Sequence, residues 1–153
     1  MDWKTLKNEI YFWDGSWRDI YVQNTKLKDW EKWIGLVNEK YRINWYNGKT
    51  SQSEDKIKFD VIKEHWDGNG DLCSTANIFL DKIQVNAHFF DDSEIENDID
   101  PREFKSLDDH NKLIDYLKSV SIACEKEVIV TLENSPEYVL MKINGNEVEI
   151  IRN

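Results

Sequence analysis

The densest set of chemically active side chains is the acidic segment 91–103, DDSEIENDIDPRE, which holds seven carboxylates against one arginine. Clustered carboxylates attract a cationic protein surface and speed its association. Ile95 and Ile99 interrupt the acids and offer apolar contacts. The segment therefore predicts a docking surface for a basic protein, with a solvated loop or a charge-guarded edge strand as the structural alternatives. The predicted contact residues are Asp91, Asp92, Glu94, Glu96, Asp98, Asp100 and Glu103.

The uneven distribution of charge supports this interpretation. Residues 1–90 contain 13 basic and 14 acidic side chains, whereas residues 91–153 contain 7 and 16, within a net charge of −10. All seven tryptophans lie at or before Trp66. An acidic surface repels a phosphate backbone, so we expect a basic protein as partner and no nucleic acid.

Metal-dependent chemistry finds little support in the motifs. The segment 65–73 contains five possible metal ligands, His65, Asp67, Asn69, Asp71 and Cys73, and its DGNGD sequence is similar to the start of a calcium loop. However, Leu72 stands where such a loop needs glycine, and Ile78 stands where it needs the closing glutamate. We therefore expect a glycine-rich connection between strands, with no metal and no cofactor.

Enzyme motifs are also missing from the sequence. The three histidines, His65, His88 and His110, belong to no HExxH motif, and the chain has neither GxSxG nor a glycine-rich phosphate loop. The sequence therefore favours a non-catalytic protein. A cysteine and a histidine brought together by the fold are the alternative.

An aromatic segment offers a different kind of site. The sequence IYFWDGSWRDIYV, residues 10–22, predicts a hairpin in which Trp13 pairs with Trp17 across Asp14-Gly15-Ser16. Ile10, Phe12, Ile20 and Val22 would then share one face, and Tyr11, Trp13, Trp17 and Tyr21 the other. The aromatic face is either covered by a helix or exposed as a platform for a small ligand or a sugar ring.

Helical periodicity identifies the elements that must position these groups. Asp2 caps a short predicted helix, and apolar residues at helical spacing over 27–41 predict a longer one that begins after Asn24 or Thr25. Ser106 with Asp109 three residues later resembles a capping box, and it is followed by an apolar stripe through Val120.

Strand patterns fill most of the remaining chain. Strands are predicted over 41–46, 56–61, 75–80 and 83–89, with a mobile loop at KTSQSED, and three more over 127–151. Asn144-Gly145 predicts a two-residue turn that pairs Ile143 with Asn146 and Met141 with Val148. The expected class is α+β, with antiparallel meanders of about eight to nine strands, two main helices packed on the sheet, and an order consistent with a two-half pseudo-repeat.

Length and composition favour one domain spanning 1–153. We expect it to be cytoplasmic, since the sequence shows neither a membrane-spanning apolar run nor a signal peptide. Cys73 and Cys124 are expected to be buried, reduced thiols.

Three stretches resemble small uncharacterised bacterial proteins: WDGSWRDIYV, KDWEKWIGLV and the closing TLENSPEYVLMKINGNEVEI. The size and acidity are similar to those of immunity proteins that neutralise polymorphic toxins. This pattern-level resemblance implies a stoichiometric protein inhibitor, often of a basic nuclease, and assigns no role to any single residue.

Overall fold

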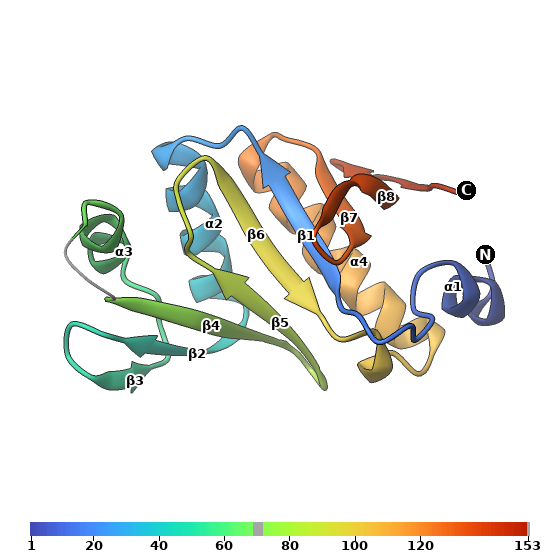
Figure 1. Ribbon diagram of the computed structural model, residues 1–153, viewed down its shortest axis with the longest axis horizontal. Helices are drawn as coiled ribbons and strands as arrows, with labels where there is room; N and C mark the ends of the chain where they lie inside the picture. Colours follow the sequence, from blue (N-terminus) through green and yellow to red (C-terminus); the bar gives the residue numbers. More distant parts are fainter. Residues whose placement is uncertain (69–71, 153) are drawn as a thin grey trace.

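A computed structural model describes residues 1–68 and 72–152. In this part of the chain nine strands form one antiparallel sheet in the order β3-β2-β4-β5-β6-β1-β7-β8-β9 (Figure 1). The strands are β1 (Arg18–Gln23), β2 (Arg42–Asn47), β3 (Gln52–Glu54), β4 (Cys73–Leu80), β5 (Ile83–His88), β6 (Glu94–Ile99), β7 (Val128–Leu132), β8 (Ser135–Asn144) and β9 (Glu147–Ile150). The helices are α1 (Trp3–Glu9), α2 (Leu27–Lys40), α3 (Phe59–Trp66) and α4 (Leu107–Cys124), with a 3-10 turn, η1 (Pro101–Glu103).

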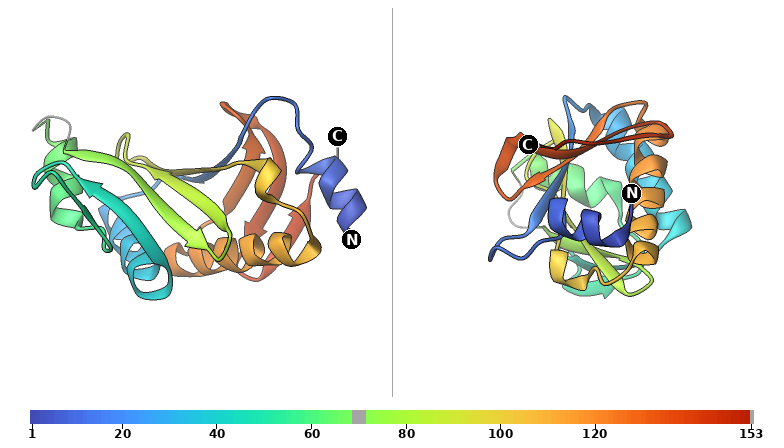
Figure 2. Two further views of the ribbon diagram at one scale, coloured as in Figure 1. Left: turned by 90° about the horizontal axis from the view of Figure 1, so that it is seen from below. Right: turned by 90° about the vertical axis from the view of Figure 1, so that its right-hand side faces the viewer.

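The predicted α+β class is confirmed, and the two long helices, α2 and α4, pack side by side on one face of the sheet (Figure 2). Strands β4-β5-β6 and β7-β8-β9 are two meanders, and β1 lies between them because it pairs with both β6 and β7. The first strand of the sequence therefore lies between two strands from its second half, β6 and β7. We call the face of the sheet opposite α2 and α4 the outer face.

The helix-covered side forms the core. Alternate residues of the central strands, such as Ile20, Val85 and Ile99, point into it and are buried. A buried polar chain ties both helices to the sheet: the indole N–H of Trp33 donates to Tyr116 Oη at 3.2 Å, and that hydroxyl donates to Asn97 Oδ1 at 2.5 Å. These bonds fix how the helices lie on β6.

The predicted first hairpin is wrong, because residues 10–17 form no strand. Ile10 is the C-cap residue of α1 instead, and the fully buried guanidinium of Arg18 forms hydrogen bonds that hold the following turn together. Arg18 donates to the carbonyl oxygens of Ile10 at 2.8 Å, Ser16 at 3.0 Å and Trp17 at 3.1 Å, and also to that of Phe12. An arginine thus satisfies carbonyl groups that a partner strand would otherwise bond.

Two further strand assignments need correction. Residues 56–61 do not form a strand, because Phe59 begins α3, which buries Val61 and Ile62 on one helical face. The supposed loop KTSQSED contains the short edge strand β3, paired with β2. The first error arises because a short apolar alternation fits helix and strand equally well, and the second because the polar residues of β3 carry no strand pattern.

The capping predictions hold for the two outermost helices. Asp2 accepts a hydrogen bond from the Thr5 amide, and Ser106 accepts one from the Asp109 amide. The N-cap of α2 is Lys26, one residue after Thr25 and two after Asn24, the two predicted caps.

The closing hairpin is shifted from its predicted register. Asn144 pairs with Glu147 and Met141 with Ile150, so Gly145 and Asn146 form the two-residue loop. The glycine takes the positive φ, +60°, that such a loop requires.

Candidate functional site: the acidic outer face

The acidic segment contributes a central strand of the sheet. Within it, β6 lies between β5 and β1, so the solvated-loop and edge-strand interpretations are both wrong. Its residues alternate: Ile95, Asn97 and Ile99 are buried, whereas Glu94, Glu96 and Asp98 are half-buried and point to the outer face. A period of two thus places three carboxylates in a row on one side of the sheet.

Neighbouring strands add further polar side chains to this row. Asp19 of β1 stands directly opposite Asp98, and Asn86 of β5 stands opposite it on the other side. The side-chain amide of Asn77 donates to Asn86 Oδ1, and the side-chain amide of Asn86 donates to Asp98 Oδ1, both at 2.9 Å. A hydrogen-bonded ladder therefore crosses β4, β5 and β6 and holds the Asp98 carboxylate in place.

His88 is the basic member of this cluster. Its Nε2 lies 2.7 Å from Asp98 Oδ2, and its Nδ1 lies 3.2 Å from Thr75 Oγ1. Burial lowers the pKa of His88, but the hydrogen bond to Asp98 and the charges of Asp98, Glu96 and Asp19 outweigh burial, so the pKa is raised. The order Thr75, His88, Asp98 has the form of a nucleophile, a base and its orienting acid.

The carboxylates beside His88 hold protons more tightly than usual. Burial, followed by the charge of Asp19, raises the pKa of Glu96 to about 6 despite the nearby His88. Asp19 is 4% exposed; burial raises its pKa, although it accepts hydrogen bonds from the Asn134 amide at 2.7 Å and the Tyr21 hydroxyl at 3.0 Å. The fold therefore keeps acids close together at an electrostatic cost that a cationic partner would relieve.

A hollow of about 390 Å³ opens above this cluster. Asn86, His88 and Asp98 form part of its lining, and Trp17 and Glu133 also border it. The Trp17 amide donates to Glu133 Oε1 at 2.8 Å, which ties the two bordering segments together. Carboxylates beside an indole ring are suited to receive an ammonium or guanidinium group.

The structure separates the predicted acidic residues into three groups. Glu94, Glu96 and Asp98 share the outer face. Asp91 and Asp92 lie in the β5–β6 turn, which also borders a hollow beside the end of α3. At the other end of β6, Asp100 caps η1 and forms an ion pair with Arg102 at 2.9 Å. The Glu103 side chain accepts a hydrogen bond from the backbone amide of Gln84 at 3.1 Å.

The predicted aromatic platform is not brought together. Tyr11 is buried, stacked on Phe104, with its hydroxyl 2.6 Å from His110 Nδ1. Trp13 is 48% exposed beneath the guanidinium of Arg102, whose Cζ lies 4.0 Å from the ring centroid. Of the four residues, Trp17 borders the hollow on the outer face and Tyr21 is buried in that face.

Asp19 and His88 are the site residues that the sequence prediction omitted. The alternation within each strand places both on a polar face, since Asp19 precedes the apolar Ile20 and His88 follows Ala87. Only the pairing of β1 and β5 with β6 shows that they meet the acidic segment.

Among the described residues, no group of three or more His, Cys, Asp or Glu side chains is placed to hold a metal ion. Two of the five possible metal ligands, Asn69 and Asp71, lie outside the described residues, as does the Cys73 side chain. The other predicted thiol, Cys124, is free and buried, and burial raises its pKa to about 11.

Comparison of this chain with protein-family models, with curated proteins and with solved structures finds no match. No helix among residues 1–68 and 72–152 has the length and apolar character needed to cross a membrane.

Proposed function

We propose that this chain is a non-catalytic protein-binding domain whose outer sheet face covers a basic surface of another protein, as an immunity-type inhibitor does. One observation carries the proposal: Glu94, Glu96 and Asp98 project from a central strand on the side opposite α2 and α4, beside Asp19. A rigid sheet presents these carboxylates in a fixed arrangement, which favours rapid and specific docking.

The raised pKa values of Glu96 and Asp19 support a binding role for the face. Burial raises both pKa values, with a further contribution from the charge of Asp19 at Glu96 and from Asp98 at Asp19. The ionised carboxylates therefore destabilise the free domain, and such strain is common where function selects for it. A lysine or arginine from a partner would relieve the repulsion and enter the hollow beside Trp17. The bound domain would then block the partner's own anionic ligand from that surface.

Affinity capture tests this proposal with two variants of equal charge change. The face variant combines Glu94→Gln, Glu96→Gln and Asp98→Asn; the control variant combines Glu31→Gln, Glu39→Gln and Asp55→Asn, three exposed acids that lie away from the outer face. Each immobilised protein is incubated with lysate of the source cell at about 50 mM and about 500 mM salt, since salt screens exposed charges.

We expect the wild type and the control variant to retain one basic protein at low salt, identified by mass spectrometry, and the face variant to lose it. Equal retention by the face variant would show that the outer face is not the binding surface. Failure of all three proteins to retain a specific partner would contradict the protein-binding function itself.

A further inference from the structure

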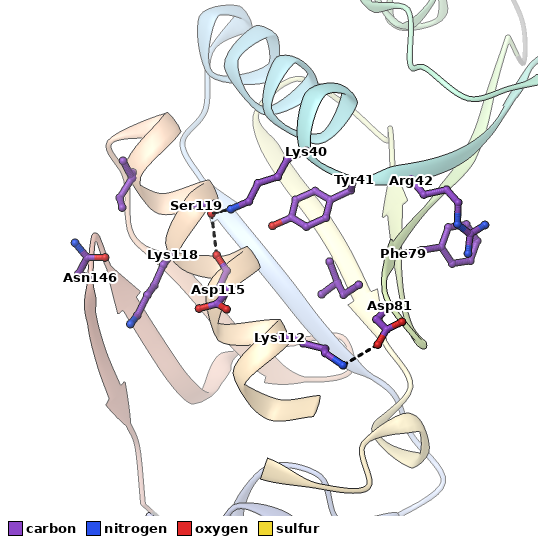
Figure 3. Close-up of a pocket in the computed structure, with 12 residues that line it drawn as sticks. Lys40, Tyr41, Arg42, Phe79, Asp81, Lys112, Asp115, Lys118, Ser119 and Asn146 are labelled. Atoms are coloured by element: carbon purple, nitrogen blue, oxygen red, sulfur yellow. Dashed lines mark hydrogen bonds and ion pairs between the residues drawn. The ribbon is translucent and has the colours of Figure 1, made fainter. Parts of the chain in front are cut away.

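A second hollow, of about 580 Å³, lies between the C-terminal end of α2, the middle of α4 and the β4–β5 turn (Figure 3). Its residues differ from those of the acidic face, so its role is independent of the proposed protein docking. A hollow of this volume falls within the range of small-molecule sites. We call it the basic groove, because four basic and two acidic side chains line it in a chain whose net charge is −10.

The interior of the basic groove is apolar. Leu80 is 4% exposed, and the ring of Tyr41 projects into the hollow and makes an edge contact with Tyr116, with centroids 5.6 Å apart. Ile122 of α4 borders the groove with half of its surface exposed. Together these side chains offer a surface on which a flat apolar ring can pack.

Three of the cations around this interior have no carboxylate partner among the described residues. Lys40 Nζ donates to the Ser119 hydroxyl at 2.8 Å, and the guanidinium of Arg42 stacks on Phe79 with Cζ 3.9 Å from the ring centroid. Lys118 makes neither an ion pair nor a hydrogen bond through its side chain within the described chain. These cations therefore have their charge available for an anion.

The fourth cation provides the contrast. Lys112 Nζ is bound by two carboxylates, Asp81 at 2.8 Å and Asp108 at 3.1 Å, so its charge is compensated within the chain. The remaining acid of the lining, Asp115, lies on α4 and leaves the positive charges of Lys40, Arg42 and Lys118 in excess. A ligand that carries negative charge and an apolar body matches this combination better than a neutral one.

We propose that the basic groove binds a small organic anion in which an oxyanion group, a carboxylate or a phosphate monoester, is attached to a flat apolar ring. The ring would pack on Tyr41 and Leu80, and the oxyanion would take a hydrogen bond from Lys40 and be attracted by the charge of Lys118 on the same lining.

Nuclear magnetic resonance titration of the uniformly ¹⁵N-labelled chain tests the proposal with three probes that share one ring system: 1-naphthyl phosphate, 1-naphthoate and the uncharged 1-naphthol. The double variant Lys40→Gln/Lys118→Gln removes two of the available cations. The control variant Lys4→Gln/Lys28→Gln makes the same change of charge at exposed lysines that do not line the groove. The spectrum of each variant shows directly whether it is folded.

We expect at least one anionic probe to shift amide signals of residues 40–42, 79–81 and 115–122, and the double variant to bind it at least about fivefold more weakly than the control variant does. Preference for the phosphate or for the carboxylate identifies the oxyanion class. Equal binding of 1-naphthol would overturn the proposal, as would shifts scattered outside the groove or undiminished binding by the folded double variant.

Discussion

Replacement of Glu96 by glutamine should stabilise the free domain at alkaline pH. Glu96 lies half-buried on the outer face opposite Tyr21 and beside Asp19, and its pKa is raised from 4.5 to about 6. A glutamate whose pKa is higher in the folded than in the unfolded state stabilises the fold when protonated. That contribution is fully present below pH 4.5 and is lost as the pH rises through about 6. Above this range the ionised carboxylate is a net cost to the folded state.

The size of this cost follows from the shift. Each pKa unit corresponds to about 1.4 kcal/mol, so the shift of Glu96 corresponds to about 2 kcal/mol in the free energy of unfolding. Partial exposure to solvent reduces the effect, and we expect the Glu96→Gln variant to be more stable than wild type by about 1 to 2 kcal/mol at pH 8. The difference should vanish at pH 4, where both side chains are neutral.

Urea denaturation followed by tryptophan fluorescence measures this difference at pH 8 and pH 4. The control variant Glu31→Gln alters an exposed residue of α2 and should change the unfolding free energy by less than about 0.5 kcal/mol. A Glu96→Gln variant that is less stable than wild type at pH 8 would refute the reasoning, as would a gain that persists unchanged at pH 4.

Three further predictions concern the groups that shape the site and its supports. Asp98→Asn removes the charge bonded to His88 Nε2, so the pKa of His88 should fall in a proton NMR titration; an unchanged value would show that other charges raise it. Burial lowers the pKa of His110 to about 4, so the contribution of neutral His110 to stability is full above pH 6.5 and is lost as the pH falls to 4. In urea unfolding this loss should amount to about 3 kcal/mol for the wild type. A His110→Asn variant should lack this pH-dependent loss. Arg18→Met leaves the buried carbonyl groups around Ile10 and Ser16 without their donor and should cost at least about 3 kcal/mol of unfolding free energy; a loss below about 1 kcal/mol would mean that the turn finds other partners.

Local patterns predicted much of the fold because their causes are local. Asp2 and Ser106 each accept the predicted capping hydrogen bond, and the strict alternation over 83–88 places Val85 in the core and His88 on the outer face. Such features depend on residues three or four apart in a helix, or two apart in a strand.

The first hairpin could not be predicted because its outcome depends on distant contacts. Tyr11 packs on Phe104 and meets His110 about a hundred residues away, while β1 pairs with β6 and β7. Sequence alternation in 10–22 is compatible with a local hairpin, but these long-range contacts are stronger determinants of the final pairing.

The candidate site could be predicted only in part, because it too depends on contacts between distant segments. The sequence predicts that the acids of the segment 91–103 form a site, and Glu94, Glu96 and Asp98 do share one face. Their meeting with Asp19 and His88 follows from strand order, which hairpin patterns do not determine.

The most direct test of the central claim is the association rate of the captured basic protein with wild type and with the face variant, measured by stopped-flow fluorescence over about 50 to 500 mM salt. Docking through the outer face predicts a rate for wild type that falls steeply with salt, and a face variant that associates slowly and with weak salt dependence. Identical rates and identical salt dependence for the two proteins would show that binding does not use the acidic outer face.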